Sequence, residues 1–92
     1  MLMFEFDPAK SQSNREKHGI DFVAAQNLWP DERLLFVPAR DGEPPERRWL
    51  AIGQIDGHHW SAIFAERDDR IRIISVRRAR REEVNVYDRE EP

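Results

Sequence analysis

Arginine is concentrated near the C-terminal end of this chain. Residues 67–81 contain seven arginines and two aspartates, although the whole chain has a formal net charge of −3. Residues 1–66 and residues 82–92 each carry a charge of −4, so the basic segment lies between two acidic ones. The chain has 13 arginines and only 2 lysines. Because a guanidinium group offers a planar fork of donors to two oxygens at once, this pattern indicates an anion site and favours a phosphate backbone as the ligand.

Two short turns decide which arginines meet. Asp56-Gly57 is a strong signal for a two-residue hairpin turn, and we take Asp68-Asp69 as a second one. Pairing the strands across these turns places both Arg48 and Arg72 opposite Ala65. Because side chains alternate between the two faces of a strand, four arginines are expected on one face, and we call them the arginine cluster: Arg48, Arg67, Arg70 and Arg72.

Two interpretations of this cluster remain open. Like charges that oppose each other across strands destabilise a sheet by roughly 0.2–1 kcal/mol per pair, so four of them around a small residue favour an anion-binding site. The alternative is a solvated end of the sheet, where the arginines pair with Asp68, Asp69 and Glu66. Four further arginines precede the acidic end: Arg77, Arg78, Arg80 and Arg81. They are either ordinary helix surface, paired with glutamates three or four residues away, or two of them contact a ligand.

The first expected helix lacks an apolar stripe. Lys10, Asn14 and His18 recur every four residues, so an ammonium, an amide and an imidazole are expected along one side. Histidine is the side chain whose unperturbed pKa lies near neutrality, so His18 is a candidate for general acid or base catalysis, and Lys17 is an alternative. The competing explanation is that His18 only interacts with the helix C-terminus, where a cation is favourable.

No metal or cofactor is expected. Cysteine is absent, which excludes disulfides and thiolate ligands, and no group of His, Asp and Glu has a recognised metal-binding spacing. His58 and His59 follow a turn and are expected in solvent. The three tryptophans fall on faces that are expected to be buried: Trp29, Trp49 and Trp60.

The turn signals and the hydrophobic periodicity predict one α+β domain over residues 1–92. The expected order is β-α-α-β-β-β-β-α, with helices packed on a small antiparallel sheet. The expected elements are a strand at 3–6, helices at 8–18 and 22–29, strands at 33–37, 47–55, 58–67 and 70–76, and a helix that begins near residue 78. Asp7 and Asp21 are expected to cap the first two helices, and Gly19 to end the first. Residues 38–46 read as a proline-rich loop and residues 88–92 as a flexible acidic tail.

Composition excludes several classes of protein. No segment approaches eighteen consecutive apolar residues, so no membrane span is expected. The N-terminus has no basic region leading into an apolar run, which argues against a secretory signal and favours the cytoplasm. A pI of about 5.6 argues against a protein that coats nucleic acid without specificity.

Four sequence segments together resemble the BrnT family of type II toxins: FEFDPAK at 4–10, KHGIDF at 17–22, RRWLAIG at 47–53 and RIRIISVRRARREE at 70–83. The resemblance covers nearly the whole chain in the same order, with Phe6 at a position where the family commonly has tryptophan. It implies a RelE-like ribonuclease fold that cuts RNA without a metal and halts translation. It also implies a BrnA-like antitoxin, typically in a heterotetramer, which binds the operator DNA.

The resemblance and the residues together predict the roles of individual side chains. The RNA 2′-hydroxyl is expected to attack the adjacent phosphate, which Arg48, Arg67 and Arg72 would hold. His18 or Lys17 would assist proton transfer, and Arg77 would orient the substrate. Further RNA contacts are expected from Lys10, Lys17, Arg70 and Arg78. Two alternatives remain: a catalytically silent module that binds RNA or protein, and a pure interaction protein whose arginines receive an acidic partner segment.

Overall fold

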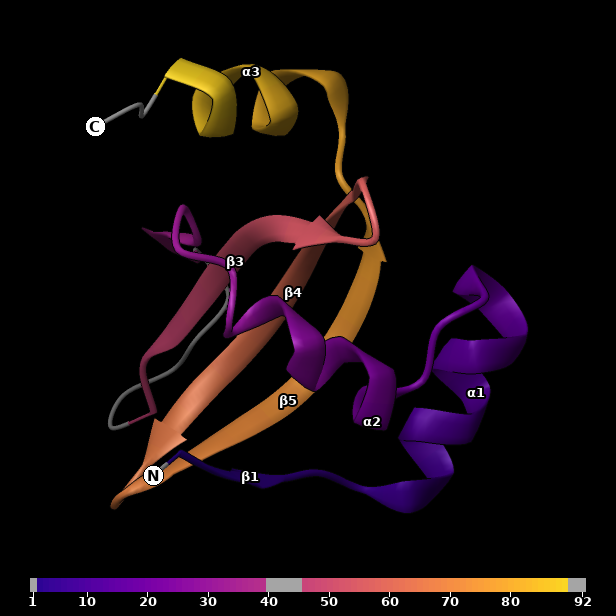
Figure 1. Ribbon diagram of the computed structural model, residues 1–92. Coiled ribbons are helices and arrows are strands. Elements are labelled where there is room, and N and C mark those ends of the chain that lie inside the picture. The colour runs from indigo at the N-terminus through magenta and orange to yellow at the C-terminus, as the bar shows by residue number, and fades with distance from the viewer. Residues whose placement is uncertain (1, 40–45, 90–92) are drawn as a thin grey trace.

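The computed structural model describes residues 2–39 and 46–89. Figure 1 shows the elements, which follow one another as β1 (Met3–Glu5), α1 (Pro8–His18), α2 (Phe22–Ala25), the 3₁₀ helix η1 (Gln26–Leu28), β2 (Leu35–Pro38), β3 (Arg48–Ile55), β4 (His58–Arg67), β5 (Arg70–Arg78) and α3 (Arg81–Arg89). This order and the α+β class agree with the prediction. The second predicted helix is divided, because its last residues form η1 instead of a continuous α-helix. Within the described residues, no helix is long and apolar enough to cross a membrane.

The sheet has the strand order β1-β5-β4-β3-β2 and is mixed. Strands β2 to β5 pair antiparallel, as predicted, but β1 pairs parallel to β5. The expectation of a wholly antiparallel sheet was therefore wrong. A parallel neighbour requires a long connection, and the chain supplies one because β1 leads into two helices before it reaches the rest of the sheet.

A bulge in β5 determines which side chains enter the core. The pairs Ile63–Ser75 and Phe64–Ile73 leave one extra residue in β5 between them. Because an extra residue reverses the alternation, Val76 turns toward the core, where it is fully buried, and Arg77 turns to the opposite face.

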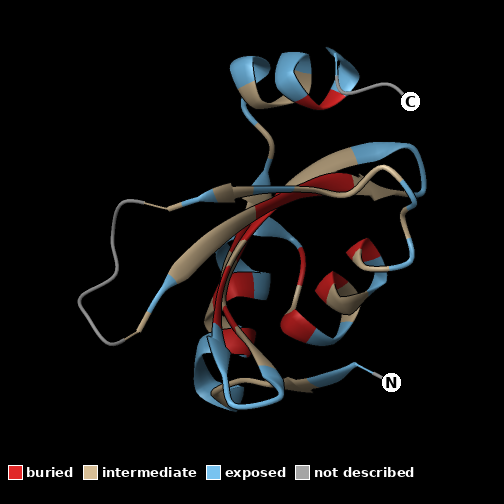
Figure 2. Ribbon diagram, turned by 90° about the vertical axis from the view of Figure 1, so that its left-hand side faces the viewer, coloured by how far each residue is buried: buried red, intermediate tan, exposed pale blue. Residues whose placement is uncertain are grey.

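The core lies between the sheet and the helices α1 and α2. Figure 2 shows the buried residues along the surfaces where these helices meet the sheet. The fully buried members of this core come from α2, η1 and the three central strands, and include Phe22, Ala25, Leu28, Ala51, Ala62, Ile73 and Val76. The helix α3 packs on the other face, over one end of β3 and β4. The other end of that face holds the arginine cluster.

Asn14 attaches α1 to the edge of β5. Its side-chain amide donates to the carbonyl of Val76 at 2.9 Å and accepts from the N–H of Val76 at 3.1 Å. It also donates to the carbonyl of Ile20 at 2.8 Å. Because β1 pairs with only three residues of β5, Asn14 takes the place of a neighbouring strand at Val76. The predicted polar row on α1 is thus broken, since Asn14 is buried whereas Lys10 and His18 are exposed.

The predicted bounds of α1 and the predicted start of α2 are confirmed, whereas the last helix begins later than expected, at Arg81, because β5 continues to Arg78. Asp7 accepts a hydrogen bond from Ala9 and Asp21 accepts one from Ala24, and Gly19 ends α1 with a left-handed φ of 78°. The expected tail at residues 88–92 begins too early, because residues 88 and 89 still belong to α3. Residues 90–92, like residues 40–45 of the predicted loop, lie outside the part of the chain that is described.

Candidate functional site

The arginine cluster forms with the predicted strand register. Arg48 and Arg72 are the cross-strand partners of Ala65 on its two sides, and Arg67 pairs with Arg70. Both turns have the two-residue geometry that this register needs, since Asp56, Gly57 and Asp68 adopt positive φ angles. Ala65 is fully buried between the arginines.

Two glutamates pair with all four arginines of the cluster. The carboxylate of Glu5 lies 2.8 Å from Arg72 and 3.9 Å from Arg70. The carboxylate of Glu46 lies 3.3 Å from Arg67 and 3.6 Å from Arg48. Four guanidinium groups share two carboxylates, so these six side chains together carry a formal charge of +2.

These ion pairs differ from the ones expected for a solvated sheet end. Among the described residues, the pairs with Asp68, Asp69 and Glu66 do not form, and Glu5 and Glu46 take their place. A hollow of about 530 Å³ lies beside these groups, lined by Met3, Glu5, Arg67, Asp68, Asp69 and Arg70. The cluster is therefore open to solvent at the turn between β4 and β5.

One donor of the cluster is unused. The Nε of Arg48 is shielded from solvent and has no hydrogen-bond partner within the described residues. A buried donor without an acceptor costs about 1–3 kcal/mol. The glutamates of the cluster therefore leave one donor of Arg48 unsatisfied.

Arg77 belongs to a separate ion pair on the same face. Its two terminal nitrogens donate to the two oxygens of Glu83 at 2.7 and 2.8 Å. Glu83 also accepts from Ser61 and from the backbone N–H of Arg80. The bond from Arg77, with help from these two donors, lowers the pKa of Glu83 to about 2 despite its burial. Glu83 likewise raises the pKa of Arg77. Arg77 therefore joins α3 to the sheet and does not enter the arginine cluster.

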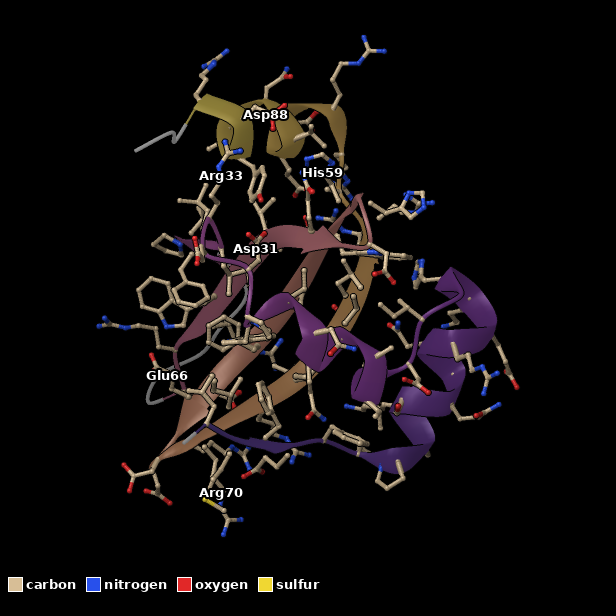
Figure 3. All side chains as sticks on the ribbon, viewed as in Figure 1. Asp31, Arg33, His59, Glu66, Arg70 and Asp88 are labelled. Atoms are coloured by element: carbon tan, nitrogen blue, oxygen red, sulfur yellow. The ribbon has the colours of Figure 1, made fainter. Side chains whose placement is uncertain are left out.

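A second polar network holds the other end of α3. The hydroxyl of Tyr87 donates to Asp31 at 2.7 Å, and the same carboxylate accepts from the backbone N–H groups of Arg33 and Gln54. Burial alone would raise the pKa of Asp31, but these three hydrogen bonds outweigh it and lower that pKa. Burial, together with the bond to Asp31, raises the pKa of Tyr87 to about 12. Figure 3 shows Arg33 and His59 between Asp88 of α3 and Asp31 below it. The guanidinium of Arg33 lies over the ring of Tyr87, 5.0 Å from its centre.

Of the two histidines beside the turn, His58 is exposed, as expected, whereas His59 is partly buried. His59 packs edge-on against Tyr87, with ring centroids 5.2 Å apart, and its Nε2 lies 3.1 Å from Gln54. His58 contacts Arg78, whose guanidinium lies 4.9 Å from the centre of the Trp60 ring. Arg78 therefore covers an aromatic core residue and lies away from the arginine cluster.

The candidate residues of α1 do not join the cluster. Asn14 meets β5 at Val76, four residues from Arg72, which corresponds to about 13 Å along a strand. Lys17 and His18 lie further along α1, away from β1. Within the described residues, the side chains of Lys10, Lys17 and His18 are exposed and make no hydrogen bond or ion pair.

Metal ligands are not grouped in the part of the chain that is described. Within residues 2–39 and 46–89, no three His, Asp or Glu side chains are placed to hold a metal ion.

Comparison with known proteins gives the family. Residues 6–83 match the family described as "Ribonuclease toxin, BrnT, of type II toxin-antitoxin system". The chain belongs to the BrnT family. Membership makes it a ribonuclease toxin and implies an antitoxin partner. A search among curated proteins found no match.

The match includes the arginine cluster and most of the contacts that dock α3. It extends over all four cluster arginines and over Glu46, but Glu5 precedes it and Tyr87 follows it. Sequence reasoning missed both glutamates of the site. A signal for Glu5 existed, because its strand alternation places it on one face, but the parallel pairing with β5 had to be known first.

Proposed function

We propose that this BrnT protein is an endoribonuclease that cleaves RNA through the 2′-hydroxyl, without a metal ion. The observation that supports this proposal is the convergence of Arg48, Arg67, Arg70 and Arg72 around Ala65, on the end of the sheet face that α3 leaves open. Arginine forks bind phosphate oxygens in pairs and stabilise the charge that develops on phosphorus during attack.

The glutamates of the cluster have two roles in this mechanism. In the free protein, Glu5 and Glu46 hold the arginines in place through ion pairs at 2.8 to 3.9 Å. When a phosphate replaces them, a released carboxylate beside the phosphate can accept the proton of the 2′-hydroxyl as the 2′-oxygen bonds to phosphorus. The bond between phosphorus and the 5′-oxygen then breaks, and the departing oxygen takes a proton from the resulting carboxylic acid or from water. The proposed proton acceptor is therefore Glu5 or Glu46. His18 and Lys17 do not take this role in the proposal, because both lie on α1, away from the cluster.

The remaining parts of the proposal come from the family. Cleavage of RNA would halt translation, and a BrnA-like antitoxin would neutralise the toxin, in a heterotetramer that reaches operator DNA through the antitoxin alone. The α+β fold, a five-stranded sheet with helices packed against it, is consistent with a RelE-like ribonuclease. Lys10 and Lys17, which are exposed on α1, remain candidates for peripheral contacts with RNA.

The test is cleavage of RNA by purified protein in the presence of a chelator. We expect Arg72→Ala to lose cleavage and growth arrest while it keeps the circular dichroism spectrum of the wild type. Arg81→Ala is the matched control, because Arg81 is exposed at the start of α3. Full cleavage by Arg72→Ala would contradict the site. RNA binding without products in the wild type would instead indicate a catalytically silent RNA-binding module.

A further inference from the structure

An apolar pocket lies back to back with the arginine cluster, on the other face of the sheet. Its volume is about 330 Å³, within the range of small-molecule sites, and its lining is mostly aromatic. The lining consists of Leu2, Trp29, Phe36, Trp49, Phe64, Glu66 and Ile71. Three of the lining residues are direct chain neighbours of cluster arginines: Trp49 follows Arg48, Glu66 precedes Arg67, and Ile71 lies between Arg70 and Arg72.

The aromatic walls are held in place by one another. Phe64 contacts Trp29 and Phe36 edge-on, with both pairs of ring centroids 5.4 Å apart. Phe36 is 48% exposed, so one wall of the pocket is open to solvent. Flat aromatic walls of this kind bind unpaired nucleobases by stacking, and they do so for every base because each has a π face.

Glu66 gives the pocket a single charged group. Glu66 lines the pocket, and among the described residues its carboxylate makes no hydrogen bond or ion pair. This is unexpected beside so many arginines, which pair with Glu5 and Glu46 instead. Figure 3 shows Glu66 and Arg70 at the end of the sheet away from α3. A carboxylate is an acceptor only, so it selects ligands that present N–H donors.

Guanine presents the best complement to this carboxylate. Its Watson–Crick edge carries two adjacent N–H donors, which the two oxygens of one carboxylate can accept together. Uracil offers one N–H donor between two carbonyl acceptors, and these oxygens would face a negative charge. An aromatic pocket with one free carboxylate would therefore hold a base by stacking and would select guanine over uracil by hydrogen bonding.

We propose that this pocket binds an unpaired guanine base of the RNA whose phosphate the arginine cluster holds. The inference rests on the proposed ribonuclease function, because the RNA must pass over the end of the sheet at the turn between β4 and β5. The hollow at this turn is lined by Arg67 and Arg70 together with Glu5, Asp68 and Asp69. It is also lined by Met3, and the preceding residue, Leu2, belongs to the pocket.

The test uses short 2′-O-methyl oligouridylates with or without one guanosine, which cannot be cleaved through a 2′-hydroxyl. Trp29 and Trp49 line the pocket, so quenching of tryptophan fluorescence reports its occupancy. We expect the guanosine-containing oligonucleotide to bind roughly tenfold or more tightly. Glu66→Gln should reduce this preference, since an amide has one acceptor and its N–H₂ opposes the guanine donors. Phe36→Ser should weaken binding of both oligonucleotides.

Two controls separate these effects from general changes. Glu16→Gln removes the same charge from the exposed surface of α1, and Val23→Ser removes an exposed apolar side chain from α2. We expect both controls to keep the wild-type affinities and preference.

The possible outcomes distinguish this inference from the proposed function. Cleavage of RNA without any guanosine preference in binding would overturn the pocket and leave the ribonuclease proposal intact. Guanosine-dependent binding without cleavage would support the pocket and contradict the enzyme. A Phe36→Ser variant that binds both oligonucleotides normally, but no longer binds the protein partner, would assign the pocket to that partner and overturn the inference.

Discussion

Arg77 and Glu83 form a two-pronged ion pair that joins α3 to the central strands, with nitrogen–oxygen distances of 2.7 and 2.8 Å. Glu83 also bonds to the Arg80 N–H at the beginning of the helix, so one carboxylate both caps α3 and docks it. The pair is mostly removed from solvent, with the side chain of Glu83 13% exposed. This contact determines how α3 lies on the sheet and how much of the sheet face remains for the arginine cluster.

Replacing Glu83 should destabilise the protein. Glu83→Gln leaves Arg77 partly buried without its charge partner, and hydrogen bonds to charged groups contribute about 1.5–3 kcal/mol each. We expect the free energy of unfolding in urea to fall by about 1–3 kcal/mol. Glu16→Gln, at an exposed position of α1, should change it by less than about 0.5 kcal/mol. Equal effects from the two variants would show that the pair contributes nothing specific.

The same pair predicts how stability depends on acid. The pKa of Glu83 is lowered from 4.5 to about 2 in the folded protein. A lowered pKa in the folded state stabilises the protein above the unfolded value, and this contribution is lost as the pH falls from about 5 toward 2. The difference in unfolding free energy between wild type and Glu83→Gln should therefore shrink across this window. A difference that stays constant down to pH 2 would contradict the lowered pKa.

The raised pKa of Tyr87 predicts a loss of stability at high pH. Its pKa is raised from 10.0 to about 12, so the unfolded chain loses the phenolic proton first. The stability that the protonated hydroxyl of Tyr87 gives to the folded protein is complete below pH 10 and is lost as the pH rises toward 12. Because Tyr87 is the only tyrosine of the chain, its phenolate absorbance can be followed directly. We expect a midpoint near 12 in the folded protein, a return to about 10 in denaturant, and no such limb of the stability curve in Tyr87→Phe.

Asn14 should be among the most sensitive positions of α1. Asn14→Ala removes three buried hydrogen bonds and leaves the Val76 N–H and C=O and the Ile20 C=O without partners. We expect a loss of about 2–4 kcal/mol in unfolding free energy, measured in urea. Gln12→Ala, at an exposed position of the same helix, is the matched control. A small loss for Asn14→Ala would mean that water replaces the amide at the β5 edge.

The sequence predicted the local features of this fold well, because single residues determine them. Asp56-Gly57 and Asp68-Asp69 define two-residue turns, and the alternation of side chains then brings Arg48 and Arg72 together. The bulge in β5 was not predicted, since no glycine or other signal marks it. It changes the face of every later residue in the strand, so Arg77 lies on the face that α3 covers and pairs with Glu83 there.

Contacts between residues far apart in the chain were also not predicted from the sequence. Glu5 reaches Arg72 only because β1 pairs parallel to β5, and this pairing crosses more than sixty residues of chain. Asn14 was read as one member of a polar row, yet its partner Val76 is equally distant in sequence. Periodicity shows which residues share a face of a helix, but it does not show which edge of a sheet that face will meet.

The glutamates of the arginine cluster should compete with RNA. The carboxylate of Glu46 lies 3.3 Å from Arg67 and 3.6 Å from Arg48, so a phosphate must displace it. Glu46→Gln removes this competitor, and we expect uncleavable RNA to bind severalfold more tightly, with a steeper dependence on salt because more cationic charge is free to release counterions. Glu16→Gln changes the net charge equally at a distance from the cluster. Binding that tightens equally in both variants would show that only net charge matters, whereas an effect confined to Glu46→Gln would identify Arg48 and Arg67 as the phosphate contacts.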